Sequence, residues 1–147
     1  MPDNQIIACL EQKVILMTKV LDLTKQIQVR SKQPDIDLED FLNQRASYMK
    51  RVQKCSDLIS SLTKQLSPEQ QKRMMQILNS TVSEEDCDGE ELTILTLTQN
   101  ISALFQRTAS LDKSAYEAIK NQYNLVREKL NQLRKEGKTP SMFSTHR

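Results

Sequence analysis

The chain has 147 residues, of which 21 are basic and 19 acidic, so its net charge is only +2. This length predicts one domain, and the near-balanced charge gives no field that would favour a nucleic-acid partner. Two glycines and four prolines are too few for the tight turns of a β-sandwich or an α/β fold, so we expect an all-α protein.

The first predicted helix covers residues 3–32 and stops before Pro34, because the residue preceding a proline is pushed out of the helical region. Its apolar residues form two neighbouring stripes, which would allow it to contact two other helices at once. We therefore expect this helix to lie centrally. The stripes are Ile7, Leu10, Val14, Met17 and Leu21, and Leu16, Val20, Leu23 and Ile27.

The second helix is predicted to start after Asp37, a favourable N-cap residue. Its seam alternates steps of three and four residues, and only Arg45 interrupts the apolar pattern. Two interpretations of Arg45 are open: the charge fixes register or partner choice, or the stem covers apolar surface while the head reaches water. The seam contains Leu38, Phe41, Arg45, Tyr48, Val52, Cys55, Ile59, Leu62 and Leu66.

A short third helix is predicted after Ser67, with Ser67 as N-cap, Pro68 in the first turn and Gln70 completing a capping box. Its apolar face contains Met74, Ile77 and Leu78, and it should end at residue 79 or 80. The acidic residues 83–91 then form a solvated connector. They do not match a calcium-binding loop, because Leu95 would occupy the position of the bidentate glutamate.

The last helix is predicted over residues 90–136, which contain no proline or glycine and precede Gly137. One helix of this length would span roughly 70 Å, so its distal turns should project beyond the bundle or meet a partner. The alternative is a break at residues 110–114, with Asp112 capping a new helix. The seam shifts near Ala115 and comprises Ile94, Leu97, Ile101, Leu104, Thr108, Leu111, Ala115, Ile119, Tyr123, Val126, Leu130 and Leu133.

These elements predict an elongated antiparallel helical bundle of three long helices plus one short connecting helix. Residues 1–136 would form a single domain, and residues 137–147 a flexible tail. The N-terminus has no basic region before an apolar core, and no apolar run of 18 residues occurs. We therefore expect no secretion signal, no membrane span and a cytoplasmic location, which the three widely spaced cysteines also favour.

The sequence predicts neither an enzyme nor a cofactor or metal site. The single histidine, His146, lies in the tail, and no phosphate-binding loop, metal-binding pair or Cys/His cluster occurs. Cys9 and Cys55 fall on apolar faces and are expected to be core residues.

A protein-binding function is better supported, because amphipathic helices bind partners through apolar residues at helical spacing. The candidate contacts are Ile119, Tyr123, Val126, Leu130 and Leu133, continued in the tail by Met142 and Phe143. Nearby basic residues would favour a partner with acidic flanks. The alternative is that this stripe packs against the first helix or closes a homodimer, as in a self-assembling coiled-coil structural or adaptor protein.

The order of elements resembles that of the FlgN/FliT type of flagellar export chaperones over the whole length. Their second helix often carries an L-x-x-Q-R/K run, which Leu42, Gln44 and Arg45 match in part. Their last helix closes near L-R-x-G-K, which residues 133–138 match with one residue inserted, followed by a tail with an aromatic, here Phe143. The asparagine-rich pattern of their last helix is limited here to residues 99–100 and 121–124.

The resemblance implies a cytosolic chaperone that binds the amphipathic C-terminal helices of hook-associated or filament-cap subunits. It would keep these subunits unpolymerised and deliver them to the type III export apparatus. The last helix would make the contacts.

Overall fold

The computed structural model describes residues 2–137, which form four α-helices and one short 3-10 helix, without a strand in that range. The all-α prediction is therefore confirmed. The elements are α1 (Pro2–Arg30), α2 (Glu39–Lys64), α3 (Pro68–Leu78), η1 (Glu84–Asp86) and α4 (Gly89–Lys135).

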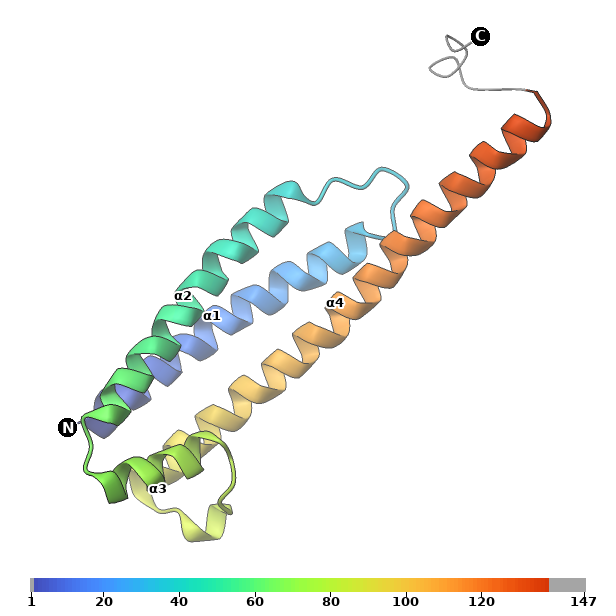
Figure 1. The fold of residues 1–147 in the computed structure, drawn as a ribbon. Coiled ribbons are helices and arrows are strands. Elements are labelled where there is room, and N and C mark those ends of the chain that lie inside the picture. The colour runs from blue at the N-terminus through green and yellow to red at the C-terminus, as the bar shows by residue number, and fades with distance from the viewer. Residues whose placement is uncertain (1, 138–147) are drawn as a thin grey trace.

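The central helix is α1, which packs against both α2 and α4. Figure 1 shows α2 running antiparallel to α1, while α4 runs in the same direction as α1 on its other side. This confirms the central position that its two apolar stripes predict. All residues of both stripes are buried except Ile7 and Val14, which are half-buried.

The core consists of two clusters along α1. The larger one lies where α3 covers the end of the bundle, and the smaller one lies farther along α1 and includes Val52 of α2. Residues from all four α-helices meet in the larger cluster, which explains how a short helix of 11 residues is held in place. The larger cluster includes Ile6, Leu10, Ile59, Leu62, Met74, Ile77, Ile94, Leu95 and Ile101.

The starts of α2 and α3 follow their sequence signals closely. Ser67 caps α3 as predicted, since its Oγ accepts the backbone N–H of Gln70 at 3.4 Å. Helix α2 begins one residue later than predicted, with Leu38 at the N-cap position. The Asp37 carboxylate still accepts a backbone N–H, that of Glu39, at 3.3 Å.

Arg45 of α2 forms polar contacts with both other long helices. Its Nη1 donates to Oδ1 of Asp112 on α4 at 2.5 Å and to Oγ1 of Thr24 on α1 at 3.1 Å. Only 21% of its side chain is exposed. The guanidinium therefore binds polar side chains of both neighbouring helices through Nη1, while part of the side chain stays exposed.

Helix α4 is continuous over its 47 residues, so the predicted long helix is confirmed and no break occurs near Asp112. It ends where Gly137 adopts φ +72°, a left-handed conformation that glycine adopts without steric cost. The N–H of Gly137 donates to the carbonyl of Arg134 at 3.2 Å. In Figure 1, α4 continues well past the ends of α1 and α2.

Candidate functional site

The distal part of α4 carries large apolar side chains that no other helix covers. Tyr116, Tyr123 and Val126 are 68%, 64% and 58% exposed, and Ile119 is 36% exposed. Leu130 and Leu133 are half-buried. We call these six residues the distal surface; their spacing of three and four places them on one face of the helix.

The distal surface begins where α1 ends. Up to Ala115, every residue of the α4 seam is buried or half-buried. Two hydrogen bonds then tie α4 to the end of α1 and the following loop: Gln28 Nε2 donates to Ser114 Oγ at 3.3 Å, and Gln122 Nε2 donates to the Lys32 carbonyl at 3.2 Å. Because α1 stops at Arg30, it offers no apolar side chains to the turns beyond.

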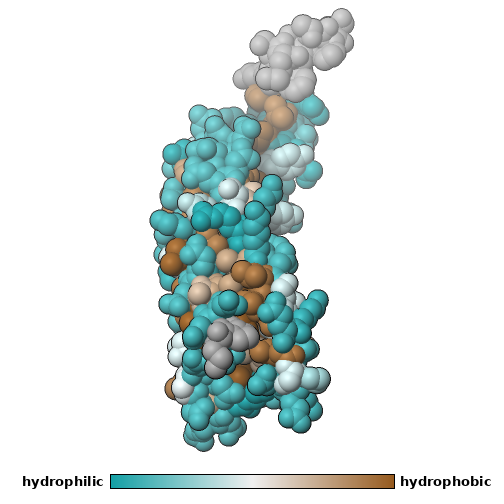
Figure 2. All heavy atoms as spheres, turned by 90° about the vertical axis from the view of Figure 1, so that its left-hand side faces the viewer, coloured by the Kyte–Doolittle hydropathy of each residue, from teal (hydrophilic) through white to brown (hydrophobic). Residues whose placement is uncertain are grey.

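Five of the six residues were predicted from the sequence. Tyr116 was missed because the predicted seam passes through its neighbour Ala115 instead. The predicted contacts Met142 and Phe143, like His146, lie outside the described residues. Leu125 is also 61% exposed, but it lies outside the distal surface, about 160° around the helix from Tyr123 and about 100° from Val126. Figure 2 shows apolar atoms on the projecting end of α4 as well as in the middle of the bundle face.

A row of basic residues runs beside the distal surface. Lys113, Lys120, Arg127 and Arg134 recur every seven residues, so they lie along one line of the helix next to the apolar face. The Arg127 guanidinium lies 6.0 Å from the centre of the Tyr123 ring. Residues 116–135 contain five basic and two acidic side chains. This end of the molecule is therefore positively charged.

Candidate metal ligands and one cysteine can be assessed among the described residues. Within residues 2–137, no group of three His, Cys, Asp or Glu side chains is placed to hold a metal ion. Burial raises the pKa of the Cys9 thiol, and the nearby Cys55 adds to this effect. A raised pKa lowers the thiolate fraction at neutral pH, which is the opposite of what a nucleophilic cysteine requires.

Comparisons with protein-family models, curated proteins and solved structures found no match for the chain. The resemblance to FlgN/FliT chaperones therefore stays a prediction. Among the described helices, none is both long and apolar enough to cross a membrane.

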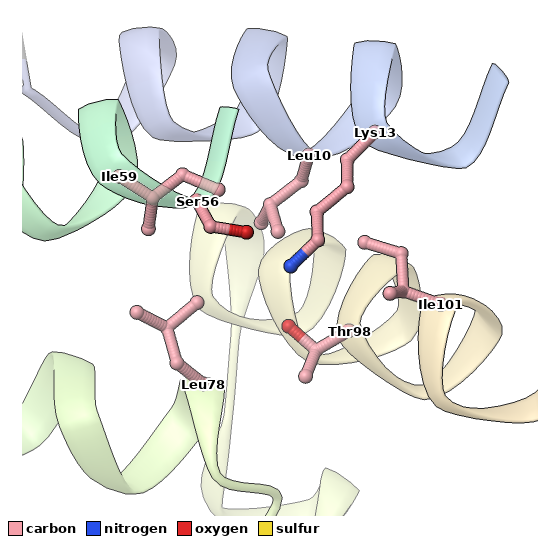
Figure 3. A pocket seen from close by; sticks show the side chains of 7 residues that line it. All are labelled: Leu10, Lys13, Ser56, Ile59, Leu78, Thr98 and Ile101. Carbon is pink, nitrogen blue, oxygen red and sulfur yellow. The ribbon is translucent and has the colours of Figure 1, made fainter. Parts of the chain in front are cut away.

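A hollow of about 150 Å³ lies within the bundle, at the level where α3 meets the long helices. Figure 3 shows the Lys13 side chain extending from α1 into this hollow. Burial lowers the pKa of the Lys13 amine below its ordinary value of 10.5, although the nearby Cys55 opposes the shift. The apolar lining consists of Leu10, Ile59, Leu78 and Ile101.

We expect Lys13→Met to raise the free energy of unfolding at pH 7 by about 0.5–1 kcal/mol, because it removes a partly buried charge and keeps the apolar stem. The gain should be constant at pH values below the folded-state pKa. It should shrink as the pH rises toward 10.5, where the unfolded chain also loses the proton. Urea denaturation at several pH values measures both effects. A loss of stability at pH 7 would contradict this account of Lys13.

Proposed function

We propose that this chain is a non-enzymatic binding protein whose distal surface receives an amphipathic helix of a protein partner. The observation that carries the proposal is the exposure of Tyr123 and Val126 on the part of α4 that passes beyond α1. Burying a side chain of this size contributes about 1.5–3 kcal/mol, so a partner helix with a matching apolar face would gain substantially.

The charge beside the distal surface favours a different chain as the partner over a second copy. In an antiparallel homodimer, the rows of Lys120, Arg127 and Arg134 from two molecules would lie on the same side of the seam and repel each other. A partner helix with acidic flanks would instead be attracted to this row, and its association rate would fall with increasing salt.

The sequence resemblance implies a more specific function of this kind, that of an export chaperone. The partner helices would then be the C-terminal segments of flagellar hook-associated or filament-cap subunits. Such segments are amphipathic because they pack in the assembled structure, and the distal surface would cover them reversibly in the cytoplasm before type III export.

The double substitution Tyr123→Ala/Val126→Ala tests the proposal. We expect it to weaken binding of these C-terminal segments, supplied as peptides, by at least about tenfold, because it removes two of the three most exposed side chains of the distal surface. Helicity by circular dichroism should be unchanged. Isothermal titration calorimetry measures the affinity.

The matched control is Leu125→Ala, which removes a similarly exposed side chain that lies outside the distal surface and should leave the affinity unchanged. If the double variant unfolds, the distal surface is part of the core and the proposal fails. If the wild-type chain sediments as a tight dimer and the double variant as a monomer, the surface pairs two copies, as a self-assembling coiled coil requires.

A further inference from the structure

The distal surface does not continue the seam that α4 buries in the bundle. Within the bundle, the buried seam repeats every seven residues, and beyond Ala115 the same repeat lies one residue later. A shift of one residue turns the apolar face by about 100° around the helix. The repeat passes through Ile101, Thr108 and Ala115 in the bundle and through Tyr116, Tyr123 and Leu130 beyond it. The distal surface therefore points to a different side of α4.

The distal surface has the pattern of one strand of a two-stranded coiled coil. Its six residues supply both apolar positions of the three heptads between residues 116 and 136. The residue after each second apolar position is basic, which places a row of charges along one edge of the seam. This basic edge consists of Lys120, Arg127 and Arg134, and the opposite edge carries Gln122, Lys129 and Glu136. Charges at such edge positions select the partner and its orientation.

The chain's own loop lies beside the edge opposite the basic edge. There, Gln122 donates to the carbonyl of Lys32, in the loop after α1, at 3.2 Å. Among residues 2–137, no hydrogen bond or ion pair joins Lys120 or Arg127 to another helix. Acidic side chains of a partner could therefore pair with both residues without displacing an existing contact.

A second copy of this chain would not supply those acidic side chains. In a parallel pair, each edge faces the opposite edge of the other strand, so Lys129 of one copy would face Arg134 of the other. In an antiparallel pair, the basic edges of the two copies would meet. Neither arrangement forms an ion pair along the distal surface, so the charges favour a different chain with acidic residues at heptad spacing.

The bundle end of the distal surface is acidic. Arg45 of α2 contacts Asp112 of α4, and α2 runs antiparallel to α4, so the start of α2 lies level with the first turns of the distal surface. Residues 35–40, which lead into α2, contain four acidic and no basic side chains. Negative charge favours the N-terminus of a neighbouring helix over its C-terminus. This favours a partner helix that starts at the bundle and runs parallel to α4.

We propose that the distal surface forms a parallel, two-stranded coiled coil with one partner helix of about three heptads. The partner carries an acidic residue immediately before each of its first apolar positions, because in a parallel pair that residue lies opposite the basic edge. This inference rests on the proposed function, since it specifies the partner of the same surface.

Three peptides of identical composition test the proposal with the full-length protein. Each has three heptads with isoleucine and leucine at the apolar positions. Its three glutamates are placed before the first apolar positions, after the second apolar positions, or on the outer face. We expect the first peptide to bind about fivefold or more tightly than the other two, since it alone forms ion pairs in the parallel arrangement. Isothermal titration calorimetry at low salt measures the affinities, at concentrations where sedimentation shows each peptide to be a monomer.

A charge reversal tests the same pairing from the protein side. Lys120→Glu/Arg127→Glu should reverse the preference, so that a peptide with lysines in place of the first peptide's glutamates binds more tightly than the first peptide. The matched control Arg107→Glu/Lys135→Glu makes the same change in net charge at exposed residues outside the basic edge and should keep the preference. Circular dichroism verifies that each variant is folded.

The outcomes separate this inference from the proposed function. If the second peptide binds most tightly, the pair is antiparallel and the proposal is overturned. If the first peptide binds no more tightly than the outer-face peptide, the basic edge does not select the partner, and the proposal is overturned while the proposed function stands. If none of the three peptides binds, the proposed function itself fails.

Discussion

Replacing Ile94 by alanine is expected to lower the free energy of unfolding by about 2–4 kcal/mol. Ile94 is fully buried in the larger core cluster, where residues of all four α-helices meet. Removing three carbons there takes away apolar contacts and leaves a cavity that the surrounding helices fill only in part. Urea denaturation followed by circular dichroism measures the change.

The control for Ile94→Ala lies on the same helix, 32 positions further along. Val126→Ala also shortens an apolar side chain, but Val126 is 58% exposed, so stability should change by less than about 0.5 kcal/mol. The difference between the two variants measures how unequally the two halves of α4 contribute to the fold. Similar losses in both would mean that the distal surface is packed in the free protein.

The helices and most of the core could be predicted because helical periodicity depends on sequence alone. Steps of three and four residues identified the buried face of α4 as far as Ala115. The same steps continue beyond it, so periodicity alone could not show where burial stops. That point depends on the length of the neighbouring helix: α1 has 29 residues and α4 has 47. At 1.5 Å per residue, the difference leaves roughly 27 Å of α4 without cover from α1.

The polar contacts could not be predicted in the same way, because they join residues that are far apart in the sequence. Thr24 and Asp112 carry no local signal for a bond to Arg45. Asp112 even matched the pattern of a helix N-cap, whereas its carboxylate accepts a hydrogen bond from Arg45 of another helix. Likewise, nothing in the sequence places Lys13 and Thr98 in one hollow, since that requires the relative rotation of α1 and α4.

Replacing Arg45 by alanine is expected to lower the free energy of unfolding by about 1–2 kcal/mol. The substitution removes a guanidinium that donates to Asp112 and Thr24 and thereby links α2 to both other long helices. The Asp112 side chain is 45% exposed and regains water when the bond is lost, so the loss is smaller than for a fully buried pair. Thermal and urea denaturation of the variant measure the loss.

Two further variants separate the charge of Arg45 from its packing. Arg45→Met keeps the apolar stem, so it should recover the part of the loss that comes from contacts with neighbouring side chains. In a double-mutant cycle, Arg45→Ala and Asp112→Ala should show a coupling energy of about 0.5–1 kcal/mol, because the second substitution has no ion pair left to break. Strictly additive losses would mean that the contact with Asp112 adds nothing to stability, and that Arg45 stabilises the bundle only through its stem and its hydrogen bond to Thr24.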